Sequence, residues 1–369
     1  MANSERTHEG RVALVTGAAQ GLGQAIALAL AERLPQLLTL FVVVATTGCA
    51  HQSPPSSASM PDRGGSSTAL FPLSAAERDR ETVLRARFAQ FWRTATGDRR
   101  TVYDTFISLT PFAQGVSSEQ VETASVRGWW VRPSVAEHDG VILYLHGGGF
   151  VAGSAKAYRG LASQIASRTR RPVFVLDYPL APEATVPAAP NAVIAAYEWL
   201  RTNGGERIAL VGDSAGGGLS LVTLARLAHG SRPSAAVAGV AFSPWVDLAF
   251  TGASMKDARI EDPLLTYEFL QAGARMYLGG TDARDPLASP LFGDLSRLPP
   301  LLIQVGSDER LLDDARQYAE RAAGAGSRVQ LEVWQGMHHV FQVNVADLQT
   351  SGVALDRAAA FLVAAFSNR

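Results

Sequence analysis

The chain has 369 residues, enough for one α/β catalytic domain of roughly 250 to 300 residues with additional segments. Lys and Arg total 33 and Asp and Glu total 34, a formal net charge of -1, so the chain has no global positive field to hold nucleic acid or an anionic membrane. A single cysteine, Cys49, excludes an intramolecular disulfide, a thiolate zinc site and an iron–sulfur cluster.

The first segment contains a glycine-rich turn. A short apolar run at 11–17 leads into TGAAQGLG at 16–23 and then an Ala/Leu-rich stretch. This pattern resembles the opening of a short-chain dehydrogenase, whose loop brings a dinucleotide pyrophosphate to a helix N-terminus. The second strand of a βαβ unit and a later Tyr-x-x-x-Lys pair do not follow it. An NAD(P)-dependent oxidoreductase is therefore the weaker alternative, and we expect no cofactor.

A second pattern in this segment is similar to a bacterial lipoprotein signal. An apolar run at 37–45 precedes TTGC, which ends at Cys49, and a Ser/Pro/Gly-rich stretch follows. The run is too short to span a bilayer, lies far from Met1 and lacks a basic region before it. We expect a cytoplasmic protein without a stable membrane span; lipid anchoring at Cys49, from an internal start, is the alternative. Residues 1–68 are interpreted as a poorly ordered appendage or linker, native or a fusion artefact.

The pattern of a folded domain begins near residue 74. Apolar side chains at helical spacing predict an amphipathic helix over 74–95. Strand-like runs follow at 120–127, 128–132, 141–145, 172–177, 207–211, 236–242, 301–305 and 329–334, and helix-length segments at 161–169, 187–201, 216–228, 312–323 and 345–366. Apolar strands alternating with helices predict a mostly parallel sheet covered on both faces, with the first two, more polar runs as an antiparallel edge.

A candidate nucleophile follows the run 207–211. Gly212-Asp213-Ser214-Ala215-Gly216 stands between this strand and a helix, the context of a nucleophile elbow. Small residues on either side let strand and helix approach closely and force the serine Oγ to project. Ser214 is the predicted nucleophile.

A candidate oxyanion loop follows the run 141–145. It ends in HGGGF at 146–150, and three consecutive glycines carry a cost in backbone entropy. Their amides, together with the Ala215 amide, could bind the oxygen of a substrate carbonyl as its negative charge develops. The flanking His146 is expected to brace the loop.

An acid and a base are expected later in the chain, in that order. Asp308 follows the run 301–305, and it is favoured by position over Glu309, Asp313 and Asp314, which fall on the next turn or helix. The run 329–334 is followed by two adjacent histidines, His338 and His339. Spacing alone does not choose between them.

Taken together, these motifs resemble those of the bacterial relatives of hormone-sensitive lipase. The resemblance runs from about residue 74 to the C-terminus and rests on HGGGF at 146–150, DY at 177–178, LAPE at 180–183, GDSAGG at 212–217, SPWVDL at 243–248, DPLL at 262–265, DE with Leu311 at 308–309, and MHHVF at 337–341. One departure is Pro179, where many members have Arg. The family has an α/β-hydrolase fold, a mostly parallel sheet flanked by helices with a helical cap.

The resemblance also implies the site and the domains. It selects His339 as the base, and Gly148 and Gly149 as the oxyanion donors. It places N-terminal cap helices at 69–115 and a catalytic domain at 116–369, with a cap insertion at about 247–280. It implies a possible homodimer.

The function expected from these residues is a serine carboxylesterase with Ser214, Asp308 and His339 as its triad and with no metal or cofactor. Its partner is a small-molecule ester with a short to medium acyl chain. Phe88, Trp92 and Phe150 are candidate pocket walls, although such aromatic residues are more often core. Lactone hydrolysis by the same triad and a catalytically silent binding module are the alternatives.

Overall fold

The structure is a computed structural model in which residues 65–137 and 139–367 are described. The chain divides into a unit of residues 1–57 and a unit of residues 58–369. All of the described residues belong to the second unit, so the glycine-rich turn at 16–23 and Cys49 lie outside them.

A single nine-stranded sheet forms the centre of this unit, in the order β1-β9-β8-β7-β6-β4-β5-β3-β2. Only β2 and β3 break the parallel arrangement: they pair with each other, and β3 pairs with β5, in antiparallel fashion. The predicted antiparallel edge and mostly parallel sheet are thus confirmed. The strands are β1 (Gly65–Phe71), β2 (Val116–Glu122), β3 (Arg127–Pro133), β4 (Val141–Leu145), β5 (Val173–Leu176), β6 (Ile208–Asp213), β7 (Ala236–Phe242), β8 (Leu301–Gly306) and β9 (Arg328–Trp334).

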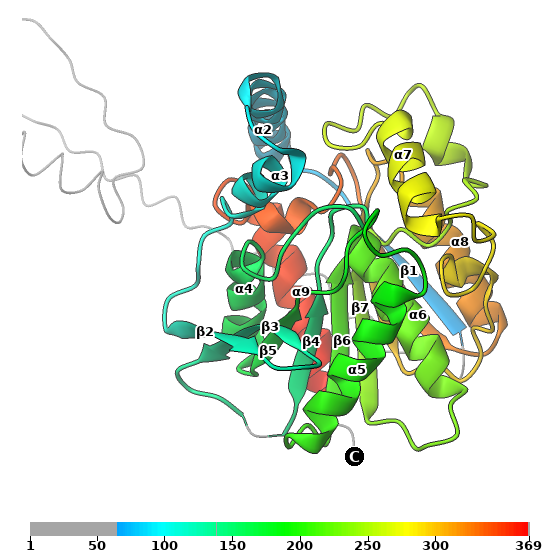
Figure 1. The fold of residues 1–369 in the computed structure, drawn as a ribbon. Coiled ribbons are helices and arrows are strands. Elements are labelled where there is room, and N and C mark those ends of the chain that lie inside the picture. Colours follow the sequence, from blue (N-terminus) through cyan, green and yellow to red (C-terminus); the bar gives the residue numbers. More distant parts are fainter. Residues whose placement is uncertain (1–64, 138, 368–369) are drawn as a thin grey trace, which may run out of the picture. The chain divides into compact units, whose positions relative to one another are not determined.

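Helices cover both faces of the sheet (Figure 1). On one face, α4 (Arg159–Thr169) packs against α9 (Gln349–Ser367) and against β3 and β5. On the other face, α5 (Ala188–Thr202) packs against α6 (Ser214–Ala228), and α8 (Leu312–Gly324) covers β8 and β9. Two apolar clusters result, and β4 contributes to both: Leu143 points into one and Ile142 into the other. Burial on both faces explains why the central strands are continuously apolar.

Helix α9 is long and apolar enough, by length and composition, to cross a membrane. Its buried residues include Leu355 and Leu362, which belong to the cluster beneath α4. The apolar character of α9 therefore has a structural explanation within the domain.

Further helices lie beyond the carboxyl ends of the parallel strands (Figure 1). They are α2 (Ala75–Thr94) and α3 (Arg99–Ile107), which lie between β1 and β2 in the chain, and α7 (Tyr267–Leu278), which follows β7. Side chains of Ser74, Asp98 and Thr266 accept hydrogen bonds from the first free amides of these three helices. Short 3-10 turns, η1 (Ala253–Lys256), η2 (Pro290–Phe292) and η3 (Phe341–Asn344), complete the regular elements.

The expectation of a linker through residue 68 is wrong for residues 65–68. They belong to β1, which pairs in parallel with β9 along its whole length. Phe71 at its end stacks on Trp334, with ring centroids 4.1 Å apart. The polar sequence of β1 gives little strand signal, because its partner β9 lies more than 250 residues later and supplies the hydrogen bonds.

Candidate active site

Ser214 stands at the junction of β6 and α6, in the left-handed region at φ 52°. The tight turn explains the flanking glycines. A Cβ on Gly216 would lie 2.0 Å from the Leu145 carbonyl oxygen, and one on Gly212 would lie 2.4 Å from the Gly216 oxygen. Strand, turn and helix therefore approach as closely as a backbone allows, and the strained serine is held at the helix N-terminus.

The oxyanion loop is attached to the nucleophile turn through Asp213. This buried carboxylate accepts hydrogen bonds from the Gly147 amide at 3.0 Å, the Tyr144 hydroxyl at 2.7 Å and the Tyr158 hydroxyl at 3.0 Å. Burial raises the pKa of Asp213 to about 6, against the lowering effect of the hydrogen bonds from both tyrosines. A Cβ on Gly147 would lie 2.3 Å from the Asp213 carboxylate, so only glycine fits there.

Two amides of the loop are left without a protein acceptor. Gly148 and Gly149 both have positive φ, 112° and 62°, and neither amide donates a hydrogen bond within the described part of the chain. The Ala215 amide lies in the first turn of α6, where backbone N–H groups have no intrahelical partner. His146 braces the loop from behind: its ring stacks on Tyr178 with centroids 4.3 Å apart.

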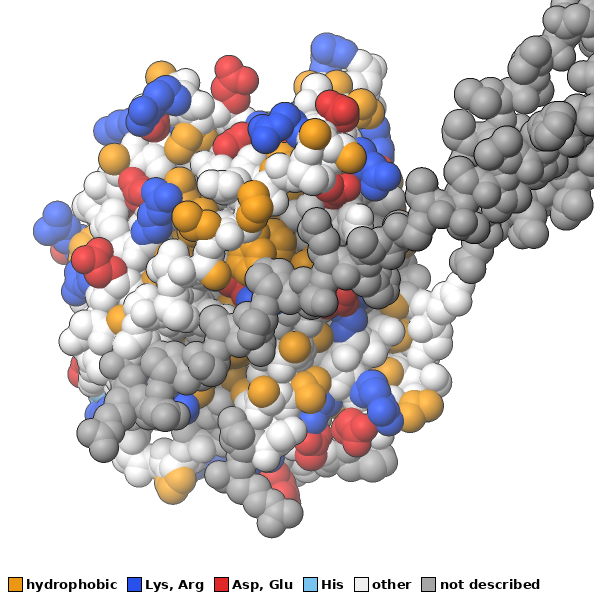
Figure 2. Space-filling view, turned by 180° about the vertical axis from the view of Figure 1, so that it is seen from behind, with side chains coloured by type: hydrophobic (Ala, Val, Ile, Leu, Met, Phe, Trp, Pro, Cys, Tyr) orange, Lys and Arg blue, Asp and Glu red, His pale blue; other side chains and the backbone are white. Residues whose placement is uncertain are grey.

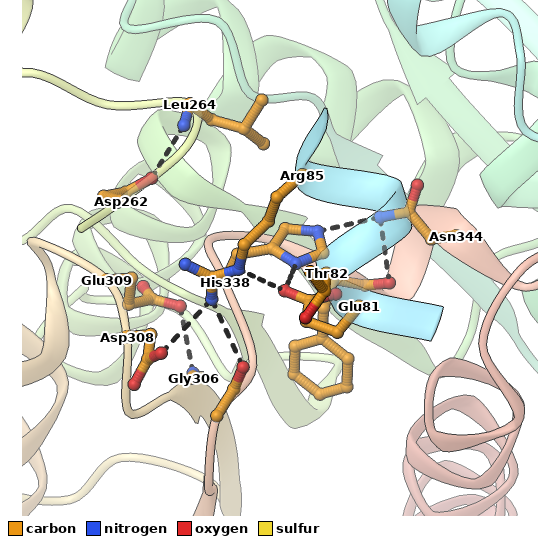
Figure 3. A network of polar contacts seen from close by, with 12 residues as sticks. Glu81, Thr82, Arg85, Asp262, Leu264, Gly306, Asp308, Glu309, His338 and Asn344 are labelled. Carbon is orange, nitrogen blue, oxygen red and sulfur yellow. Dashed lines mark hydrogen bonds and ion pairs between the residues drawn. The ribbon is translucent and has the colours of Figure 1, made fainter. Parts of the chain in front are cut away.

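The two neighbouring histidines have different surroundings. His339 Nε2 lies 2.9 Å from Ser214 Oγ, the geometry of a general base and its nucleophile. His338 points to the other side, where its Nδ1 lies 2.6 Å from Glu81 Oε1 and its Nε2 lies 2.9 Å from the Asn344 amide nitrogen (Figure 3). Its contacts are with α2 and η3, which makes it a buried structural residue.

The acid beside the base is Glu309, and the expectation of Asp308 is wrong. Glu309 Oε1 lies 3.3 Å from His339 Nδ1, and its other oxygen accepts hydrogen bonds from Ser243 Oγ at 2.8 Å and the Gly306 amide at 2.9 Å. Asp308 instead turns outward, with 46% of its side chain exposed, and pairs with Arg85 (Figure 3).

Position in the chain could not separate these two carboxylates. They are adjacent, and the dipole argument that set Glu309 aside applies only to an exposed group. Glu309 is completely buried, and an unpaired buried carboxylate would be unfavourable, so its partners determine its role.

The pKa of His339 is set by two opposing effects. Burial lowers it, because it disfavours the charged imidazolium, but the hydrogen bond and the negative charge of Glu309 raise it, and the net shift is upward from 6.5. The imidazolium that forms when Ser214 gives up its proton is thereby stabilised.

The predicted pocket walls lie in different places. Phe150 is buried directly after the oxyanion glycines and stacks on Tyr277 of α7, with centroids 3.9 Å apart. Phe88 packs edge-on against His338 at 5.2 Å, and Trp92 is 38% exposed near the end of α2. Phe269 of α7 was not predicted: a Cβ built on Gly149 would lie 3.6 Å from its ring, which places it across from the oxyanion loop.

The face of the domain opposite to the view of Figure 1 carries apolar side chains in its middle, below the two groups of helices (Figure 2). Charged side chains gather mainly around the rim of that face where it is visible.

Within residues 65–137 and 139–367, no three His, Cys, Asp or Glu side chains come together as a metal site would require.

Comparison with known proteins places this geometry in a family. Residues 142–343, which include Ser214, Glu309 and His339, match the model of a family with the alpha/beta hydrolase fold. An acetyl-hydrolase of Streptomyces hygroscopicus is 40% identical over 277 residues, which cover 73% of this chain and 92% of that protein. An esterase of Acinetobacter venetianus is 38% identical over 66% of this chain and 81% of its own length.

Solved structures agree. A crystal structure of an esterase from the bacterial hormone-sensitive lipase family superimposes with a TM-score of 0.74 at 39% sequence identity, covering 80% of this chain and 99% of its own. A mutant of the esterase E40 gives a TM-score of 0.75 at 38% identity.

Proposed function

The chain belongs to the α/β-hydrolase family, among the esterases related to hormone-sensitive lipase, and is a carboxylic ester hydrolase; we propose that it forms an acyl-enzyme on Ser214. Its proposed substrates are short- to medium-chain acyl esters. One observation carries the proposal: a strained, buried serine whose Oγ lies 2.9 Å from His339 Nε2, at the N-terminus of a helix.

In the acylation step, Ser214 Oγ attacks the ester carbonyl carbon as His339 Nε2 accepts the hydroxyl proton. Glu309 orients the imidazole and balances its new charge. The carbonyl oxygen becomes an oxyanion that the amides of Gly148, Gly149 and Ala215 bind. When the tetrahedral intermediate collapses, the carbon–oxygen bond to the alcohol breaks and His339 returns the proton to the leaving alkoxide.

Deacylation repeats this sequence with water. His339 takes a proton from the water as the water oxygen attacks the acyl carbon, and then protonates Ser214 Oγ as the carboxylic acid is released. The raised pKa of His339 suits it to both directions of proton transfer near neutral pH.

The acyl-chain preference is proposed from the surroundings of the oxyanion loop. Phe269 faces Gly149, and the buried Phe150 and Tyr277 close the space behind the loop. Bulky aromatic rings this near the reacting carbon favour small acyl groups, and the relatives from Streptomyces hygroscopicus and Mycobacterium tuberculosis that are named acetyl-hydrolases support the same direction.

The test is Ser214→Ala, assayed with p-nitrophenyl esters of two to twelve acyl carbons. We expect a loss of kcat of at least about 10³-fold and loss of labelling by a fluorophosphonate. The control is Ser220→Ala, which removes a buried hydroxyl six residues later on the same helix that donates to the Gly216 oxygen. Turnover that persists in Ser214→Ala would contradict the proposed mechanism. A preference of the wild type for the longest acyl chains would contradict the proposed substrate range.

A further inference from the structure

One arginine of the cap contacts both loops that carry the acid and the base. Arg85 lies on α2, and its Nη2 lies 3.2 Å from Asp308 Oδ2 and 3.3 Å from the carbonyl oxygen of Gly336 (Figure 3). Its Nη1 donates to the Glu261 carbonyl oxygen at 2.8 Å, and its Nε to Glu81 Oε1 at 3.0 Å. The guanidinium therefore joins α2, the segment before α7 and the loops after β8 and β9.

The contacts of Arg85 fall next to the reacting residues. Asp308 precedes Glu309 in the chain, and Gly336 lies three residues before His339. The two loops are also tied directly to each other, because the Asp308 amide donates to the Met337 oxygen at 3.0 Å. A shift of Asp308 would therefore be passed through the backbone to Glu309.

The arrangement differs from an ordinary surface ion pair. The side chain of Arg85 is 23% exposed, whereas Arg80, five residues earlier on α2, is 59% exposed and, among the described residues, pairs with Glu77 alone. The carboxylate of Glu81, which Arg85 also contacts, is 4% exposed and bonds to the buried His338. Arg85 is thus oriented by a buried partner on its own helix, and the planar guanidinium can bind several acceptors at fixed angles.

We propose that Arg85 is a positioning residue for the hydrolytic reaction. By holding the Asp308 carboxylate outward, it leaves Glu309 as the only one of the two adjacent carboxylates that faces His339. Because Arg85 is part of α2, the acid–base pair is correctly aligned only while this cap helix is seated on the two loops. The inference rests on the proposed function of Ser214, Glu309 and His339.

The test replaces Arg85 by Gln, which removes the charge, and by Lys, which keeps it. We expect Arg85→Gln to lose about 10-fold in kcat on a short p-nitrophenyl ester with little change in KM, because displaced catalytic groups slow the chemical step. Arg85→Lys keeps the charge opposite Asp308 but not the other contacts of the guanidinium, so its kcat should lie between those of the wild type and Arg85→Gln. Arg80→Gln is the control from the same helix, and its kcat should not change.

A second substitution separates positioning from general damage to the fold. Without Arg85, the Asp308 carboxylate is unpaired and competes with Glu309, so Arg85→Gln/Asp308→Asn should recover at least about half of the lost activity on a logarithmic scale. A variant damaged only in its fold would not recover in this way. Unchanged kcat in Arg85→Gln, or no recovery in the double variant, would overturn the proposal. Should Arg85→Gln not fold, Arg85→Lys takes its place: a lowered kcat that Asp308→Asn partly restores would support the proposal, and any other result would overturn it.

The rate at which a fluorophosphonate labels Ser214 gives a readout that does not depend on ester turnover. Labelling still needs His339 to accept the serine proton. If the wild type is labelled but hydrolyses no ester, the proposed substrate fails, while slower labelling of Arg85→Gln, relieved by Asp308→Asn, still supports the positioning role. If labelling rates are equal in wild type and Arg85→Gln, the positioning role fails by itself.

Discussion

The two halves of the site are held in different ways. The nucleophile and the oxyanion loop are held by close approaches of backbone inside the sheet, such as Gly216 against the Leu145 carbonyl oxygen, and by the single buried carboxylate of Asp213. The loops that carry Glu309 and His339 share a backbone hydrogen bond, from the Asp308 amide to the Met337 oxygen, but side chains add to it, and their contacts reach as far as Glu81 and Arg85 on α2.

This difference indicates which changes each half tolerates. A half built on backbone contacts responds to any added atom, whatever its chemistry. A half built on side-chain contacts responds to charge and hydrogen-bonding capacity, and it depends on the cap helix remaining in place. Substitutions in the two halves test this contrast.

The largest difference is expected between two adjacent carboxylates. Glu309→Gln should reduce kcat by about 10³-fold, because an amide cannot balance the imidazolium and can favour the wrong tautomer of His339. Asp308→Asn should reduce it by no more than about 3-fold, since the Asp308 side chain is nearly half exposed and, within the described part of the chain, bonds to Arg85 and Ser307 alone. Steady-state kinetics of the two variants decides; a larger loss in Asp308→Asn would restore Asp308 as the acid.

The same variants have a pH signature. The kcat/KM of the wild type requires neutral His339, so activity is lost as pH falls through its raised pKa, above 6.5. Removing the charge of Glu309 removes the main cause of the upward shift, so the acid limb of Glu309→Gln should move to lower pH. An unmoved limb would contradict the contact between Glu309 and His339.

A smaller loss is expected in the oxyanion loop. Gly148→Ala would place a Cβ 2.1 Å from the Ala152 carbonyl oxygen, at a positive φ, so the loop must move and kcat should fall by about 10²-fold. Gly204→Ala is the matched control, because Gly204 also has positive φ but nothing lies within 4 Å of its Cβ position. Equal kcat in the two variants, measured beside their thermal unfolding, would argue against a catalytic role for Gly148.

A further effect concerns stability rather than kcat, and it involves Asp213. Its pKa is raised by burial to about 6 from 3.8, so the native state retains a proton that the unfolded chain has lost. This contribution to stability is present below about pH 4 and is lost as pH rises to about 6, a change of about 3 kcal/mol. Asn cannot titrate, so urea unfolding at several pH values should show the stability of the wild type falling relative to Asp213→Asn by about 3 kcal/mol between pH 4 and pH 7. A difference that stays constant with pH would contradict the shift.

The sequence located the nucleophile half almost completely. Ser214 and the glycines at 147–149 stand in short sequence motifs that can be recognised without their distant contacts, and the strand before each motif is continuously apolar. The sheet was predicted equally well from the sequence, because buried parallel strands and their helices have distinct periodicities. Strand β1 was not, since its polar sequence becomes a strand only by pairing with β9.

By itself, then, the amino-acid sequence predicted the α/β-hydrolase fold, the turn at Ser214 and the loop that faces it, because short motifs and the periodicities of buried strands and helices signal these features. Spacing alone left His338 and His339 equivalent, and it ranked Asp308 above Glu309. The family resemblance favoured His339, but only the tertiary structure placed Glu309 beside it and gave the physical reason, because adjacent side chains diverge according to distant partners. Glu81 and Asn344 hydrogen-bond to His338, Arg85 pairs with Asp308, and Ser243 holds Glu309 beside His339.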